Sequence, residues 1–226
     1  MLRRRDWFRY GSLATAAVLS LTLFASARPD RVAPHIVSRN CSGCHELDGR
    51  SQLPYVPRLA GLSANYTERK LSKFRAASTT PVDEALSRIM PFGSKDSNAT
   101  RTAVENMIGI AHAISDEDGK AAVEWYAAQK PAPGRRGDGK LIKKGEEVFM
   151  AGVQSQDLAA CQSCHGPNAE GSDTAPRLAG QNAEYLLNQL ALFRAGDPDQ
   201  YPEMAKVAKN IGSDRARAVV EYLQSR

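Results

Sequence analysis

The chain has 226 residues, of which 42% are hydrophobic and 24% are charged, a balance typical of a globular protein rather than a disordered one. Its formal net charge is +5, but four arginines and one aspartate lie in the first nine residues, so the sequence from Arg28 onward holds 26 basic and 24 acidic residues. This near balance, without a Lys/Arg stripe interleaved with aromatic residues, argues against nucleic-acid binding.

The first 27 residues form a separate unit. Three arginines at positions 3–5 precede an apolar run that ends in Ala-Ser-Ala at positions 25–27. This order predicts a secretory signal peptide with an A-x-A cleavage site. An uncleaved N-terminal membrane anchor is the alternative, since the segment can be extended toward the ~20 residues of a membrane span. Both interpretations place residues 28–226 in the periplasm, either soluble or anchored to the outer face of the inner membrane.

All four cysteines lie in two C-x-x-C pairs, and a histidine directly follows each pair. The residues are Cys41, Cys44 and His45 in the first motif and Cys161, Cys164 and His165 in the second. Two disulfides or a redox dithiol would leave the histidines unexplained. A zinc site with four cysteine ligands is a further alternative, but the pairs are 120 residues apart, far beyond the ~15–20 of a zinc ribbon. C-x-x-C-H is the attachment sequence of c-type haem, in which the histidine binds the iron. The sequence therefore predicts two covalently bound haem c groups.

The surroundings of the two motifs repeat as well. The sequence P-R-L-A-G occupies positions 57–61 and 176–180, with an offset of 120 residues at the cysteines and 119 from this segment onward. A stretch rich in Pro, Gly and charge separates the copies and is typical of a linker. We therefore predict two tandem domains, at residues 28–130 and 138–226, joined by a linker at residues 131–137.

Both copies are predicted to be mainly helical, because apolar residues recur at helical spacing and no segment shows sustained period-two alternation. In the first copy, Ser115 is expected to cap the closing helix. In the second, helices are expected at L-I-K-K-G-E-E-V-F before the haem motif, after Asn182, and from Ser213 onward. Asn182 and Gly196 are suitable caps for the middle helix. Four aromatic residues are expected in the core or against the haem: Tyr66, Phe74, Tyr185 and Phe193.

Each haem motif leaves one axial position of the iron to be filled, and a methionine there closes the site and raises its reduction potential. In the second copy the candidates are Met150 and Met204. Met150 precedes the cysteines and is expected to pack in the core. Met204 lies between the two clearest helices, where the chain must cross the other face of the haem. We therefore predict Met204 as the ligand.

In the first copy the candidates are Met90 and Met107. Met107 precedes an isoleucine by seven residues, as Met204 does, and both isoleucines lead into the final helix. A packing role is the alternative for Met107, because it lies on an amphipathic stripe. We predict Met107 as the ligand, with Met90 as the alternative. Two further histidines are weaker candidates, His35 and His112.

The copies differ in length between the aromatic residue and the methionine. Phe74 and Met107 are 33 residues apart, whereas Phe193 and Met204 are 11 apart. The additional stretch, residues 77–100, is expected to be a surface excursion. A docking surface for a partner is the alternative, since loops tolerate insertions and often carry binding sites.

Together, these features resemble the dihaem cytochrome c4 family. They are the two C-x-x-C-H motifs, the two P-x-L-A-G segments followed by Tyr, and the two closing segments of Met, Ile and Ser-Asp. The resemblance covers nearly the whole chain beyond residue 27 and implies an all-α fold of two class I cytochrome c domains, each wrapped around a covalent haem. It also implies Met107 and Met204 as axial ligands, with Pro57 and Pro176 lying against the proximal histidines. The chain has C-H-E-L-D-G where the family has C-H-G, which allows a different turn after His45.

The resemblance implies an electron carrier of the respiratory chain that serves terminal oxidases, rather than an enzyme. Its partners would be electron-donor and electron-acceptor redox proteins. A fixed electron-transfer subunit of a larger membrane oxidoreductase complex is the second hypothesis, which co-purification would separate from the first. A dihaem peroxidase is less favoured, because it needs a haem with an open or displaceable ligand and each copy has a candidate methionine.

Overall fold

The structure is a computed structural model, and it describes residues 32–77, 97–172, 174–195 and 201–226. Within these ranges every extended regular element is a helix, and an isolated antiparallel bridge joins Val153 and Leu158. The predicted leader at residues 1–27, Met90 and Gly196 lie outside the described residues, as does most of the insertion at 77–100. None of the helices described is long and apolar enough to cross a membrane.

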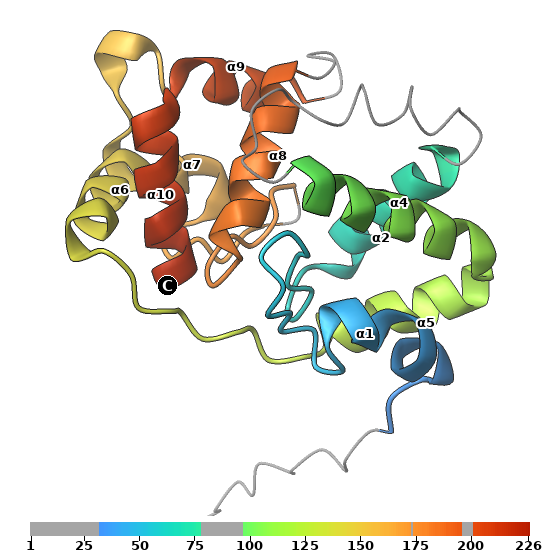
Figure 1. Cartoon of the computed structure of the whole chain (residues 1–226). Helices are drawn as coiled ribbons and strands as arrows, with labels where there is room; N and C mark the ends of the chain where they lie inside the picture. The colour runs from blue at the N-terminus through green and yellow to red at the C-terminus, as the bar shows by residue number, and fades with distance from the viewer. Residues whose placement is uncertain (1–31, 78–96, 173, 196–200) are drawn as a thin grey trace, which may run out of the picture. The chain divides into compact units, whose positions relative to one another are not determined.

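In the first half, the structure describes three longer helices within residues 33–77 and 97–127, and two short helical segments there carry the haem motif (Figure 1). Helix α2 packs against both α4 and α5. Leu71, Ala111 and Val123 form a buried cluster where these three helices meet. The elements are η1 (Val37–Cys41), α1 (Ser42–His45), α2 (Ala64–Ala77), α4 (Ser97–Ala113) and α5 (Asp116–Ala127).

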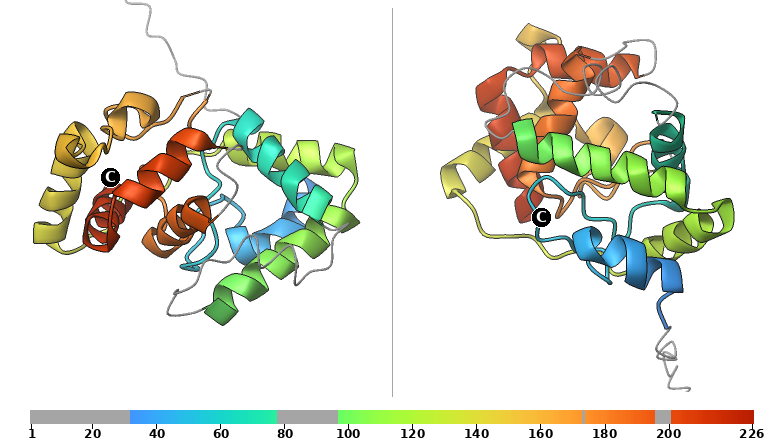
Figure 2. Two further views of the ribbon diagram at one scale, coloured as in Figure 1. Left: turned by 90° about the horizontal axis from the view of Figure 1, so that it is seen from above. Right: turned by 45° about the vertical axis from the view of Figure 1, so that its right-hand side comes forward.

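The second half, residues 139–226, repeats this plan. Helix α10 packs against α6 and α8, and α9 packs against α8 (Figures 1 and 2). The core is centred on Phe149 and Ile211, and the predicted apolar stripe of the last helix is buried there. The elements are α6 (Gly139–Ala151), η2 (Gln154–Gln156), α7 (Gln162–His165), α8 (Ala183–Ala195), α9 (Pro202–Asn210) and α10 (Ser213–Ser225).

Local capping explains where two of these helices begin. The Ser115 hydroxyl accepts a hydrogen bond from the Asp118 backbone N–H at 3.1 Å, as the sequence predicts for the start of α5. At the start of α6, the Asp138 carboxylate accepts bonds from the backbone N–H groups of Lys140 and Leu141. Each side chain satisfies donors that the first turn of a helix leaves without partners.

The P-R-L-A-G segments have the same structural role in both halves. The Gly61 N–H donates to the Tyr126 carbonyl of α5 at 3.1 Å, and the Gly180 N–H donates to the Leu223 carbonyl of α10 at 2.9 Å. Tyr126 and Leu223 are therefore equivalent positions of the repeat. Residues 130–138 connect the halves without a helix, and because residues 33–226 form one compact unit, the exact domain boundaries stay a prediction.

Candidate haem sites

Each haem motif holds its histidine in the form that binds a metal. His45 Nδ1 lies 3.0 Å from the Pro57 carbonyl oxygen, and His165 Nδ1 lies 2.9 Å from that of Pro176. A carbonyl oxygen can only accept, so Nδ1 carries the proton and Nε2 keeps its lone pair. Burial lowers the pKa of both imidazoles, against the smaller opposing effect of the carbonyl bond. Both histidines therefore present a neutral Nε2, which is the donor that haem iron takes.

A cavity of about 470 Å³ adjoins the first motif, within the ~300–1,000 Å³ typical of cofactor sites. Cys41, Cys44 and His45 line it, and so does Met107 from α4. The walls are mostly apolar, as a porphyrin plate requires. They include Val56, Leu59, Leu62, Leu71, Phe74, Val104, Ile110 and Val123. The residues present thus fit a covalently attached haem, with two thiols, one imidazole and one thioether on a single cavity.

The two methionines predicted as iron ligands differ in how the structure places them relative to the histidines. Met107 is half-buried next to the Leu71 cluster and lines the same cavity as His45. Met204 is half-buried on α9, whereas His165 ends α7, and their pairing at one iron stays a prediction. Met150 lies on α6 as expected, but it is 38% exposed, so the predicted packing of Met150 in the core is wrong.

The turn after the histidine is the same in both halves, although Glu46 stands where the second half has Gly166. Glu46 has φ 64° and ψ 161°, and Gly166 has φ 79° and ψ 156°. This region of backbone conformation is almost restricted to glycine and costs other residues about 1–3 kcal/mol. Having Glu46 in place of a glycine therefore raises the energy of this turn but leaves its backbone path unchanged. The different turn that the sequence allowed after His45 is not formed.

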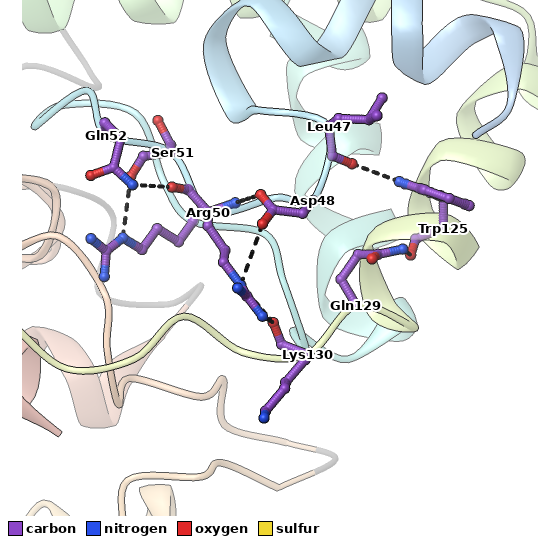
Figure 3. Close-up of polar contacts among 9 residues, drawn as sticks. Leu47, Asp48, Arg50, Ser51, Gln52, Trp125, Gln129 and Lys130 are labelled. Atoms are coloured by element: carbon purple, nitrogen blue, oxygen red, sulfur yellow. Dashed lines mark hydrogen bonds and ion pairs between the residues drawn. The ribbon is translucent and has the colours of Figure 1, made fainter. Parts of the chain in front are cut away.

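Two aromatic residues of α5 hold this strained turn. The Tyr126 hydroxyl donates to the Glu46 carbonyl at 3.0 Å, and the Trp125 indole N–H donates to the Leu47 carbonyl at 2.8 Å. Figure 3 shows the Trp125 indole directed at Leu47, with the Arg50 guanidinium bound to the Lys130 carbonyl nearby. Leu223, the equivalent of Tyr126, has no hydroxyl, so this support belongs to the first half.

Replacing Glu46 with Gly is expected to raise the free energy of unfolding by about 1 kcal/mol, because relief of the turn's strain outweighs the added backbone entropy of the unfolded chain. Denaturant titration of the haem-loaded protein, followed by Soret circular dichroism, measures the effect. Glu46→Ala is the control, since it removes the carboxylate but keeps Cβ. An equal gain in Glu46→Ala would assign the effect to charge instead of backbone strain.

Side chains of the second half bind the backbone of the first half around Pro57. The Gln181 amide both accepts from the Arg58 N–H at 2.8 Å and donates to the Arg58 carbonyl at 2.9 Å. Asn182 Nδ2 donates to the carbonyls of Val56 at 2.8 Å and Leu53 at 3.0 Å. We call Arg58, Gln181 and Asn182 the inter-half clamp.

Asn182 does not cap α8 with its side chain, contrary to expectation. Its Oδ1 accepts no hydrogen bond from any residue that the structure describes, because Nδ2 is turned toward the first half. The Ala183 N–H at the start of α8 donates instead to Gln224 Oε1 at 3.1 Å. Asn182 is only 1% exposed, so its amide is committed to the contact between the halves.

Arg58 extends the clamp toward the first haem motif. Its side chain is 5% exposed and donates to the Gly180 carbonyl at 2.5 Å and to the Ser51 carbonyl at 3.2 Å. The Ser51 hydroxyl in turn donates to the Cys44 carbonyl at 2.7 Å. A continuous set of hydrogen bonds thus runs from the second half to the haem-binding cysteine of the first.

Two haem-attachment motifs on a helical frame, each with a neutral imidazole fixed by a proline carbonyl, define a dihaem c-type cytochrome. The cytochrome c family model matches residues 33–125 and 142–226. Cytochrome c4 of Stutzerimonas stutzeri is 32% identical over 211 residues, covering 91% of this chain and 93% of the relative. The chain belongs to the cytochrome c4 family. It is accordingly an electron-transfer protein rather than an enzyme, and it carries two covalent haem c groups.

Two further similarities fit this assignment. The structure of Acidithiobacillus ferrooxidans cytochrome c4 is similar with a TM-score of 0.65 and 28% identity, over 83% of this chain and 99% of that one. A protein of Stutzerimonas stutzeri strain A1501 named thiosulfate dehydrogenase electron acceptor is 30% identical over 190 residues, covering 80% of this chain and 76% of the relative. The all-α fold of two tandem cytochrome c domains predicted from the sequence is confirmed.

Sequence reasoning missed several residues around the first site. The clamp residues Gln181 and Asn182 and the supporting Trp125 and Tyr126 act through contacts between distant segments, which no local pattern reveals. Two lysines on α2, Lys70 and Lys73, also line the first cavity. A signal for the lysines was present, since aligning the repeats places Gln189 and Leu192 at these two positions.

Proposed function

We propose that this protein passes single electrons between partners of the respiratory chain in the periplasm, toward a terminal oxidase. One haem would be held by Cys41, Cys44, His45 and Met107. The other would be held by Cys161, Cys164, His165 and Met204. The observation that carries the proposal is that His45 and Met107 line one apolar cavity, with His45 Nε2 free to bind.

The bound haem supplies the one-electron couple, and the chain's own residues set its conditions. Pro57 and Pro176 fix the imidazole tautomers through their carbonyls. The Met107 and Met204 thioethers would complete the ligand sets of the two irons, which would favour the reduced state and keep out peroxide. The mostly apolar walls of the first cavity would limit the water around its haem, and with it the reorganisation that accompanies electron transfer. The domains at 28–130 and 138–226 each supply one such site, and the leader at 1–27 takes the chain out of the cytoplasm.

A fixed subunit of an oxidoreductase complex is the second candidate, favoured by the similarity to a thiosulfate dehydrogenase electron acceptor. The donor would then be a dehydrogenase bound in constant ratio. An independent peroxidase has less support, because a methionine is available to close each site.

Oxidation of the reduced protein by membranes of its own host tests the carrier function. We expect the ferrous haem bands to disappear on mixing under air, and we expect cyanide, which blocks haem–copper oxidases, to prevent this. The same protein, tagged at its C-terminus, is also purified from gently solubilised membranes. Constant-ratio co-purification with a dehydrogenase, without cyanide-sensitive oxidation, would establish the subunit hypothesis instead.

A further inference from the structure

The cavity beside the first haem motif contains two cationic side chains, Lys70 and Lys73, one turn apart on α2. Both are half-buried. No aspartate, glutamate or arginine of the described chain lines this cavity. Two positive charges therefore face a mostly apolar space with no opposite charge among the described residues that line it, which is unfavourable unless something else provides one.

Both lysines have neutral partners. Lys70 Nζ donates to Gln189 Oε1 at 3.2 Å, and Lys73 Nζ donates to the Tyr201 hydroxyl and lies 4.0 Å from the centre of its ring. Within the described ranges, neither lysine forms an ion pair. Burial, and then the repulsion of Lys73, lowers the pKa of Lys70 to about 8. The described part of the polypeptide thus leaves the charge of Lys70 uncompensated.

The haem attached at Cys41 and Cys44 brings two carboxylates into this cavity. Its thioether bonds use one edge of the porphyrin, and its two propionates are on the opposite edge. We propose that Lys70 and Lys73 bind the propionates of the first haem and thereby raise its reduction potential. The proposal rests on the first haem being attached where the motif places it. Two ammonium groups match two carboxylates in number and in sign, and buried charged hydrogen bonds are the stronger kind.

The second half shows that the fold does not need these charges. With the offset of 119, Gln189 is the equivalent of Lys70 and Leu192 the equivalent of Lys73. Both of these residues line the same cavity from the other side. The lysines therefore distinguish the two haem sites, and replacing them with Gln and Leu tests their role with the side chains that the equivalent helix of the second half, α8, carries at these positions.

The experiment compares the variants Lys70→Gln, Lys73→Leu and the double variant with the wild-type haem-loaded protein by spectroelectrochemistry. Loss of positive charge beside a haem destabilises the reduced state, so one of the two reduction waves should move to lower potential. In the double variant the ratio of reduced to oxidised haem at a fixed potential should fall about tenfold, which is about 59 mV for a one-electron couple. Lys144→Gln, on the exposed side of α6, removes the same charge away from the cavity and should move neither wave.

Resonance Raman spectra separate contact from a general field effect, because the propionate bending bands respond to hydrogen bonding at the carboxylates. We expect these bands to shift in the Lys70 and Lys73 variants and to be unchanged in Lys144→Gln. A potential that moves without any change in these bands would overturn propionate binding, and so would waves that do not move. In either case both haems would remain attached and reducible, so the electron-carrier function would stand.

Discussion

Replacing Met107 with His is expected to lower the reduction potential of one haem strongly and to abolish its methionine–ferric charge-transfer band. Axial ligands set haem potentials over a range of about 0.8 V, and exchanging a thioether for a second imidazole should account for a fall on the order of 0.2 V within that range. The reduction potential is expected to fall because the thioether favours ferrous iron, whereas imidazole favours ferric iron. The measurement is a redox titration of the haem-loaded variant, with the near-infrared absorption recorded in the oxidised state.

Met90→Leu is the matched variant for this prediction, because Met90 is the alternative ligand in the first half. It should leave both reduction waves and both charge-transfer bands as they are in the wild type. If the band is lost in Met90→Leu and kept in Met107→His, Met107 is a packing residue next to Leu71 and Val123. The covalent attachment at Cys41 and Cys44 would be unaffected by that outcome.

Replacing Arg58 with Ala is expected to lower the free energy of unfolding by about 3 kcal/mol, since hydrogen bonds from a charged group contribute about 1.5–3 kcal/mol each. The Arg58 side chain is 5% exposed and donates to carbonyls in both halves, so its removal leaves the Ser51 and Gly180 oxygens buried without this partner. Denaturant unfolding of the haem-loaded protein, monitored by Soret circular dichroism, gives the value.

Arg177→Ala is the control for Arg58→Ala, because Arg177 occupies the same position of the repeat. Arg177 Nε is buried without a hydrogen-bond partner among the described residues, so the loss there should be clearly smaller. Equal losses in the two variants would mean that Arg58 contributes through packing alone. That outcome would remove the Arg58 side chain from the inter-half clamp and leave the contacts of Gln181 and Asn182.

Much of this protein could be predicted from its sequence, because the informative patterns are local. The C-x-x-C-H motifs, the cap at Ser115 and the apolar stripe of the last helix each depend on a few neighbouring residues. Met107 was predicted as a ligand by aligning the two repeats. The structure places Met107 on the same cavity as His45. The fold class followed directly from these features.

What could not be predicted depends on contacts between distant segments. The sequence around Asn182 is typical of a helix cap, but its amide meets carbonyls more than a hundred residues away. Glu46 suggested a different turn, yet hydrogen bonds from α5 hold it in a conformation that favours glycine. Met150 was expected in the core because it belongs to the helix before the second haem motif, and it lies at the surface. For Asn182 and Glu46, tertiary contacts outweighed the local preference.

The inter-half clamp also bears on how a duplicated protein diverges. Gln181 and Asn182 contribute side chains to the contact, whereas the first half contributes mainly backbone carbonyls and Arg58. The positions equivalent to Gln181 and Asn182 in the first half are Leu62 and Ser63, which cannot form these amide contacts. The two copies have therefore become specialised and are no longer interchangeable. A gene encoding them in the reverse order would produce both haem motifs but would lack this junction.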